Sequence, residues 1–128
     1  MYFHVRYYLK GKCNMKKSQF EPLSDTPFGY TLSLISGKWK MVILYLLAEH
    51  KVIRYNELQR KIGSITYKML SSQLKELESS NLINRKEYPE IPPKVEYSLS
   101  KRGKSLIPIL DAMCSWGSEE KPNISNYI

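Results

Sequence analysis

One change of hydrophobic period in the middle of the chain constrains its fold more than any other feature. Over residues 56–80 apolar side chains recur every three or four positions, which predicts helices. Over residues 83–99 the pattern becomes extended. Between the two extended pieces stands Pro-Glu-Ile-Pro-Pro at 89–93, which excludes a helix because each proline fixes φ and disfavours the helical conformation before it. A β-hairpin with a stiff tip is therefore predicted directly after the helices.

The helical part is interrupted once. A short helix is predicted over residues 56–62, with Asn56 as its N-cap and Gln59 completing a capping box. Gly-Ser-Ile at 63–65 forms a tight break, and Thr66 is predicted to cap a longer helix that ends near Ser80. Two helices joined by so short a break predict a helix-turn-helix.

The longer helix has two different faces. Leu70, Leu74 and Leu77 form one apolar stripe that is predicted to pack inward. The opposite face is small, polar and basic and carries no acid: Tyr67, Lys68, Ser71, Ser72 and Lys75. Such side chains suit the DNA major groove, where lysine donates to guanine or phosphate and serine donates or accepts. The alternative interpretation is an amphipathic helix with a solvated face.

The predicted hairpin strengthens the first interpretation. Its strand at residues 94–99 alternates, with Val95, Tyr97 and Leu99 pointing to one side. Basic residues lie on the hairpin and on the extended segment at 52–55 before the helices: Arg54, Arg85, Lys86 and Lys94. An ordered hairpin loses little entropy when it docks on phosphates. Taken singly, each of these bases could equally be a solvent-facing charge.

Further helices are predicted on both sides of this region. One spans about 27–35, with Asp25 or Thr26 as its cap; another spans about 38–49, with a buried stripe at positions 39, 42, 43, 46 and 47. A last helix, capped by Ser100, is predicted to bend at Pro108.

The predicted fold class is thus mainly α with a small β-hairpin (α+β), a winged helix-turn-helix at residues 21–118. Residues 1–20 form a basic arm and 119–128 a polar tail. Residues 1–14 are either a genuine arm or an extension upstream of a start at Met15.

The distribution of charge along the sequence indicates what class of partner the protein binds. The formal net charge is +8, and the excess lies in residues 1–20, with five bases and no acid, and in residues 51–104, with twelve bases and six acids. A concentrated positive field attracts polyanions. The longest apolar run, Met41 to Ala48, is shorter than the roughly 18 residues of a membrane span, so no membrane partner is expected. Residues 1–12 lack the pattern of a secretory signal, and two cysteines fit a reducing cytoplasm.

Enzyme and metal chemistry find no support in the sequence. The two histidines, His4 and His50, lie in separate segments, and no HExxH, CxxC or Cys/His cluster occurs. No glycine-rich loop leads to Lys-Ser or Lys-Thr. We therefore expect no catalytic residues, no metal and no cofactor.

Several segments together resemble a known family. These are Thr31-Leu-Ser-Leu-Ile-Ser-Gly-Lys-Trp39, Arg54-Tyr-Asn-Glu-Leu58, Lys68-Met-Leu70, Leu74-Lys-Glu-Leu77 and Tyr88-Pro-Glu-Ile-Pro-Pro-Lys-Val-Glu-Tyr97. They look like the HxlR-type regulators, bacterial winged-helix transcription factors related to the MarR group. The similarity covers about residues 26–117. It implies a homodimeric, cytoplasmic DNA-binding regulator whose terminal helices form the dimer interface.

The chain departs from this family at one informative position. Many members carry a cysteine just before the proline that opens the first helix, and redox sensors among them use its thiol. Here Thr26 precedes Pro27, and a hydroxyl cannot replace a thiolate. Cys114 is predicted to pack as a small hydrophobe in the last helix. Cys13, near several lysines, is the remaining candidate for redox chemistry.

The sequence thus predicts a homodimer that binds an inverted-repeat operator in double-stranded DNA, with no effector indicated. The predicted DNA-binding residues are Arg54, Thr66, Tyr67, Lys68, Ser71, Ser72, Lys75, Arg85, Lys86 and Lys94. The predicted dimer-interface residues are Tyr30, Leu106, Ile109, Leu110, Met113 and Trp116, some of which also serve the protomer core. The alternative is a winged helix used as a protein-interaction module with no DNA role.

Overall fold

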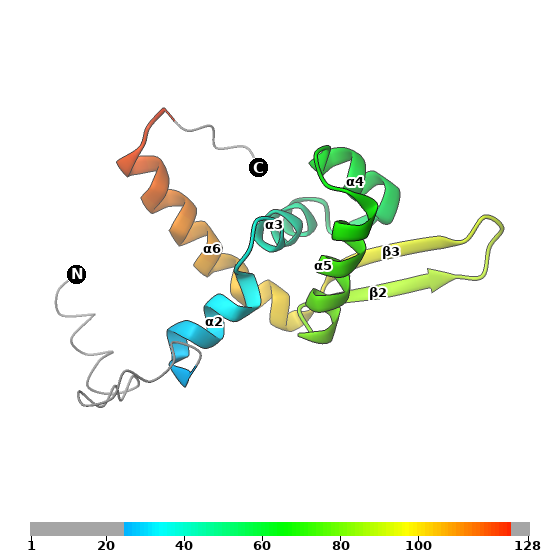
Figure 1. The fold of residues 1–128 in the computed structure, drawn as a ribbon, viewed down its shortest axis with the longest axis horizontal. Helices are drawn as coiled ribbons and strands as arrows, with labels where there is room; N and C mark the ends of the chain where they lie inside the picture. Colours follow the sequence, from blue (N-terminus) through cyan, green and yellow to red (C-terminus); the bar gives the residue numbers. More distant parts are fainter. Residues whose placement is uncertain (1–24, 124–128) are drawn as a thin grey trace. The chain divides into compact units, whose positions relative to one another are not determined.

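The structure is a computed structural model that describes residues 25–123 (Figure 1). The chain divides after Ser36 into two compact units, which we describe separately. The described part of the first unit is helix α2 (Pro27–Ile35). Of the two predicted caps it uses Thr26, whose Oγ1 accepts a hydrogen bond from the Gly29 amide at 3.0 Å. Proline suits the first helical turn because its missing N–H would find no partner there.

The second unit holds the remaining elements. In chain order these are α3 (Lys40–His50), β1 (Val52–Arg54), α4 (Tyr55–Ile62), α5 (Tyr67–Ser79), β2 (Ile83–Tyr88), β3 (Lys94–Leu99) and α6 (Lys101–Glu120). The predicted hairpin strands are confirmed with the same bounds. They belong to a three-stranded antiparallel sheet of order β1-β3-β2, because β1 pairs with the free edge of β3. The fold is an α+β winged helix-turn-helix, as predicted.

Helix α3 is the centre of this unit. It contacts α4, α5, α6 and both β1 and β3. Packing on several sides explains why Ile43, Leu44 and Leu47 are at most 1% exposed. The predicted stripe omitted Leu44, while its members Trp39 and Val42 are only half-buried. Around α3 the apolar face of α5 closes the core, and Leu70, Leu74 and Leu77 are buried as predicted.

The start of α4 differs from the prediction. The helix begins at Tyr55, so its N-cap is Arg54, two residues before the predicted cap Asn56, and Arg54 makes no side-chain cap bond. Asn56 is therefore inside the helix, and the side-chain amide of Gln59 donates to the Ile65 carbonyl at 3.4 Å. The predicted capping box is wrong because Arg54 is held in the strand by its pairing with Glu96, and the helix starts directly after it.

Helix α6 is well anchored at its N-terminus. The Ser100 hydroxyl accepts from the Gly103 amide at 3.0 Å and donates to the Asn81 carbonyl at 2.6 Å, so the predicted cap is confirmed. The helix continues through Pro108 to Glu120 and packs on α3. Within residues 25–123 no single helix is long and apolar enough to cross a bilayer; only α2 and α3 counted together pass that test.

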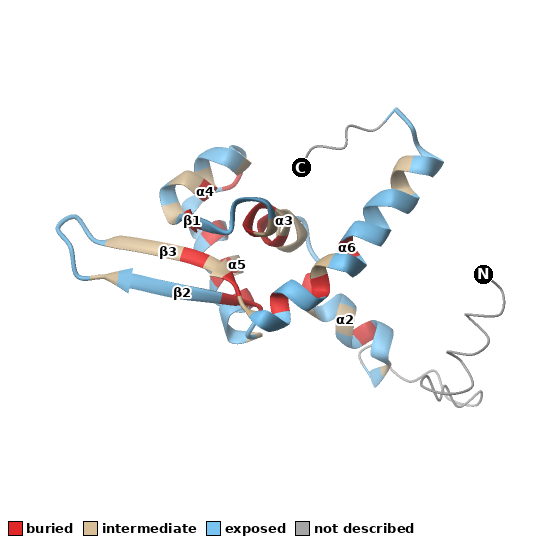
Figure 2. Ribbon diagram, turned by 180° about the vertical axis from the view of Figure 1, so that it is seen from behind, coloured by how far each residue is buried: buried red, intermediate tan, exposed pale blue. Residues whose placement is uncertain are grey.

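The C-terminal half of α6 is largely exposed (Figure 2). Leu110 is the last buried residue of the helix. Cys114 lies beyond it and is exposed, so the prediction of a packed thiol is wrong. The reason is that the core of the second unit covers α6 only over its first half.

Candidate nucleic-acid interface

The free face of α5 lies on the side of the helix away from its buried leucine stripe. Because Leu70, Leu74 and Leu77 face the core, the residues between them face solvent. Thr66 caps the helix by accepting a hydrogen bond from the Met69 amide at 3.1 Å. The predicted contact residues Tyr67, Lys68, Ser71, Ser72 and Lys75 are all exposed. No acid occurs from residue 66 to residue 75, so this face offers positive charge to phosphates, and hydroxyls that can donate to or accept from base edges.

The turn before α5 fixes the angle at which that face is presented. Gly63 ends α4 with φ +79°, a left-handed conformation that glycine adopts without strain. Its amide donates to the Gln59 carbonyl at 2.8 Å. Two residues later Ile65 is 4% exposed and anchors the turn in the core. The helix-turn-helix predicted from the sequence is therefore present and rigidly joined.

Tyr55, which the sequence analysis did not select, ties the two helices together. From the first residue of α4 its phenol donates to the Tyr67 carbonyl at 3.0 Å and lies 2.8 Å from the Ser71 hydroxyl. The Tyr55 and Tyr67 rings also stack, with centroids 5.9 Å apart and planes 14° from parallel. The first turns of α5 are thus held from α4 by both polar and aromatic contacts.

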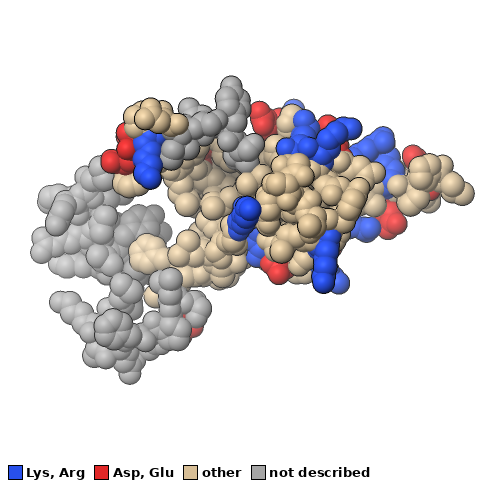
Figure 3. Space-filling view, turned by 45° about the horizontal axis from the view of Figure 1, so that its top comes forward, with Lys and Arg blue, Asp and Glu red and all other residues tan. Residues whose placement is uncertain are grey.

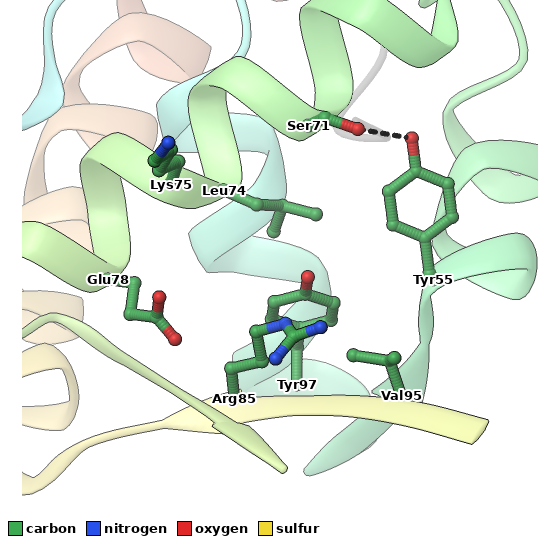
Figure 4. A pocket seen from close by; sticks show the side chains of 8 residues that line it. All are labelled: Tyr55, Ser71, Leu74, Lys75, Glu78, Arg85, Val95 and Tyr97. Atoms are coloured by element: carbon green, nitrogen blue, oxygen red, sulfur yellow. Dashed lines mark hydrogen bonds between the residues drawn. The ribbon is translucent and has the colours of Figure 1, made fainter. Parts of the chain in front are cut away.

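A hollow of about 400 Å³ separates α5 from the hairpin (Figure 4). Its lining residues come from four elements, α4, α5, β2 and β3: Tyr55, Ser71, Leu74, Lys75, Glu78, Arg85, Val95 and Tyr97. Leu74 points into it from α5, and Arg85 faces it from β2 beside Tyr97. Three predicted contact residues, Ser71, Lys75 and Arg85, are therefore brought together around one depression.

The charge of Arg85 is firmly maintained. Its pKa is raised, first by hydrogen bonding to the Tyr97 side chain and then by Glu87, whose carboxylate lies 3.3 Å from Nη1. The pKa of Tyr97 is raised mainly by burial, and Arg85 opposes that shift. The guanidinium of Arg85 thus stays charged beside Tyr97 and Glu87, and its remaining N–H groups can donate to phosphate oxygens.

The two faces of the hairpin carry different bases. Side chains alternate along a strand, so Arg85 and its partner Tyr97 share one face, and Lys86 and its partner Glu96 the other. On that second face the Lys86 and Lys94 ammonium groups lie 4.9 and 4.6 Å from the centre of the Tyr88 ring.

Glu96 organises the second face. It lies 3.0 Å from Lys94 Nζ and accepts a hydrogen bond from the Tyr88 phenol at 3.1 Å. The pKa of Glu96 is lowered, chiefly by Lys94, with Tyr88 and Arg54 adding to the effect. Lys94 is thus partly neutralised, while Arg54 and Lys86 remain exposed.

Figure 3 shows Lys and Arg side chains spread over the half of the molecule that holds α4, α5 and the hairpin, with acids between them. A second hollow of about 770 Å³ separates α4 from the hairpin tip, and Arg54, Arg60 and Lys94 lie on it together with Glu57 and Glu90. Arg60 was not selected from the sequence; its place in the last turn of α4, with Lys61, was the available signal. Among residues 25–123 no three potential metal ligands come together.

Comparison with known proteins gives the same picture. Residues 34–125 match the family model described as HxlR-like helix-turn-helix. An uncharacterized HTH-type transcriptional regulator of Halalkalibacterium halodurans is 62% identical over 107 residues, which cover 84% of this chain and 95% of that protein. The uncharacterized HTH-type regulator YdzF of Bacillus subtilis is 62% identical over 93 residues, covering 73% of this chain and 85% of the relative.

Solved structures that resemble this chain are also transcriptional regulators. The putative HTH-type transcriptional regulator ytcD superposes with a TM-score of 0.68 at 50% identity, covering 71% of this chain and 92% of that one. The reduced form of the redox regulator HypR superposes with a TM-score of 0.70 at 41% identity, covering 76% of this chain and 94% of that one. These relatives are regulators rather than enzymes. The chain therefore belongs to the HxlR-like helix-turn-helix family and is a transcriptional regulator with a DNA-binding helix-turn-helix domain.

Proposed function

We propose that the chain works in the cytoplasm as a homodimer on inverted-repeat operators, with α5 in the major groove and the hairpin on the adjoining phosphates or minor groove. The observation that carries the proposal is the free face of α5, which is exposed and carries no acid from the N-cap Thr66 to Lys75. Glu76, the next residue, is ion-paired with Lys40 at 2.8 Å, so its charge is partly compensated.

The proposed contacts fall into two groups. Residues of α5 approach base edges: Thr66, Tyr67, Lys68, Ser71, Ser72 and Lys75. Arg54, Arg85, Lys86 and Lys94 approach phosphates, which position a protein on the duplex but carry no sequence information directly. Because Arg85 lies on one face of the hairpin and Lys86 on the other, these two side chains would meet phosphates on different sides of it.

The proposed dimer uses large apolar and aromatic side chains that are partly exposed in the protomer. On α6 Ile109, Met113 and Trp116 are 48%, 47% and 63% exposed, and in α2 Tyr30 is 52% exposed. Ile109, Met113 and Trp116 recur at one-turn spacing, as an interface helix requires. We also predicted Leu106 and Leu110 for the interface. Both are buried within the protomer, so they can only pack beneath the exposed side chains of the interface.

A two-fold axis gives such a dimer its operator geometry. Two recognition helices about 34–36 Å apart enter successive major grooves of an inverted repeat. One domain alone would neutralise few phosphates, whereas about six to ten contacts make affinity fall roughly 10³- to 10⁵-fold between low and moderate salt.

The test is a fluorescence-anisotropy titration with the full chain. A duplex selected from a random pool and a scrambled duplex of the same composition are titrated at several salt concentrations. We expect a preference for the selected duplex and a steep salt dependence for both. If the selection enriches no sequence, or binding is equal on both duplexes, the proposal fails in favour of the alternative, a winged helix whose basic surface binds an acidic protein.

The two positions that bear on redox sensing, Thr26 and Cys13, lie in the N-terminal part of the chain. At the position where family sensors use cysteine, this chain has Thr26, which serves as the α2 cap. Cys13 lies outside the described residues and remains a prediction. The structural relatives include the redox regulator HypR, but that description belongs to HypR.

A further inference from the structure

We propose that Tyr55 is a positioning residue that sets the specificity of DNA recognition by fixing the hydrogen-bond polarity of Ser71. The inference rests on the proposed insertion of α5 into the major groove. Tyr55 itself lies in α4, is half-buried, and lines the hollow beside α5. It acts on the exposed residues Tyr67 and Ser71 rather than on DNA.

The argument begins with the single proton of the Tyr55 phenol. A carbonyl oxygen only accepts, so the phenol gives this proton to the Tyr67 carbonyl at 3.0 Å. The 2.8 Å distance between the Tyr55 and Ser71 hydroxyls allows either one to donate. In the proposal Ser71 has the donor role, because the phenol has one proton and the Tyr67 carbonyl takes it.

This arrangement changes what Ser71 can read. A free serine hydroxyl rotates to donate or accept and therefore discriminates poorly between bases. With its proton committed to Tyr55, Ser71 offers lone pairs only. In the major groove it would accept from the exocyclic amino group of adenine or cytosine, which are the donors that bases present there.

Tyr55 also restrains Tyr67 at the start of α5. The stacked rings hold the Tyr67 side chain in one direction although it is 61% exposed. An aromatic side chain held in place before binding loses less entropy when it meets a base. Tyr55→Phe keeps this stack and removes the hydroxyl with its contacts to the Tyr67 carbonyl and to Ser71, so comparison with Ser71→Ala and with the double variant isolates the effect on Ser71.

Without the phenol, Ser71 is released. A helical serine readily donates to the carbonyl four residues back, which here is that of Tyr67, the acceptor that Tyr55 occupies in the native protein. The hydroxyl would then leave its native direction. We expect recognition of one base to weaken while phosphate contacts from other residues stay in place.

The chain offers a matched control in Tyr45. Its phenol donates to Asp111 Oδ1 at 2.6 Å and joins α3 to α6, away from α5 and the hairpin. Tyr45→Phe therefore removes one tyrosine hydroxyl that joins two helices, as Tyr55→Phe does, although Tyr45 makes one hydrogen bond and Tyr55 makes two. A purely structural role for Tyr55 predicts the same DNA binding for both variants.

The experiment titrates the wild type, Y55F, Y45F, S71A and the double variant Y55F/S71A against a duplex selected by the wild type and against a random duplex. We expect Y55F to lose about tenfold in affinity for the selected duplex, with unchanged binding to random DNA and an unchanged salt slope. Y45F should match the wild type on both. The double variant should bind no worse than S71A, because the two residues act as one unit.

A base-substitution series completes the test. Replacing one particular adenine or cytosine of the selected duplex should lower the affinity of the wild type and leave the affinity of Y55F unchanged. The inference is overturned if Y55F behaves like Y45F, or if the Y55F and S71A losses simply add. A wild type that fails to prefer the selected duplex would instead overturn the proposed function, so the two failures are distinguishable.

Discussion

Gly103 in the first turn of α6 lies directly against the main-chain carbonyl of Leu82, before β2. A β-carbon at position 103 would overlap that carbonyl oxygen and would come within 3.2 Å of Leu99 Cδ2. The same carbonyl accepts a hydrogen bond from the Ser100 amide at 3.0 Å. The α6 N-terminus and the start of the hairpin therefore fit together only with glycine at this position.

We predict that Gly103→Ala lowers the free energy of unfolding by about 2–3 kcal/mol, because the added carbon meets the Leu82 main chain, which cannot turn aside as a side chain can. Urea denaturation at neutral pH measures the loss. Gly117→Ala is the matched control in the same helix, since within residues 25–123 nothing beyond its chain neighbours and the adjacent backbone of α6 lies within 4 Å of the added carbon. There alanine should stabilise by about 0.5–1 kcal/mol. Equal effects at the two glycines would contradict the close approach of Leu82.

Tyr45 predicts a dependence of stability on high pH. Its pKa is raised from 10.0 to about 12, first by the hydrogen bond to Asp111, then by burial and by the charge of that carboxylate. Because the folded-state pKa lies above the unfolded one, the stabilisation is complete below pH 10 and is lost as the pH rises from 10 through 12. The unfolding free energy of the wild type minus that of Tyr45→Phe should shrink over this range. A constant difference would show that the phenol proton is not shared with Asp111.

Lys68→Ala and Arg85→Ala are each predicted to weaken DNA binding while the dimer stays intact. Both cations are exposed on the proposed interface. If each contacts phosphate, its loss should lower the slope of log affinity against log salt by about 1. Lys121→Ala at the end of α6 removes the same charge elsewhere and should leave the titration unchanged. Wild-type affinity for both interface variants would remove the surface assigned here.

The dimer face is tested by placing a charge on it. Met113→Asp or Trp116→Asp should convert the dimer to a folded monomer, because both side chains are about half exposed or more in the protomer and an unpaired carboxylate in an apolar interface is costly. Light scattering after size exclusion gives the mass, and circular dichroism checks the fold. Ser115→Asp, on another side of α6, should stay dimeric. A monomeric wild type, or a dimer that survives both changes, would exclude this face.

Much of the local structure was predictable because its causes are local. The caps Thr66 and Ser100 were found from residue type and position, since the hydroxyl that accepts the amide three residues on is encoded within one turn. The hairpin bounds followed from strand alternation and from the prolines at 89, 92 and 93. The Asn56 cap failed because a distant strand, through the pairing of Arg54 with Glu96, decided where α4 begins.

The sequence by itself determined the order of the elements, the leucine face of α5 and the basic character of the region around it, because periodicity, proline geometry and charge act over a few residues. Only the tertiary structure decided that β1 joins the sheet and that Tyr55 contacts Ser71, sixteen residues away along the chain. It also decided that Leu110 is buried in the core while its neighbour Ile109 is exposed. These facts depend on which surfaces pack together. Such packing is a property of the whole unit, and no short stretch of chain contains it.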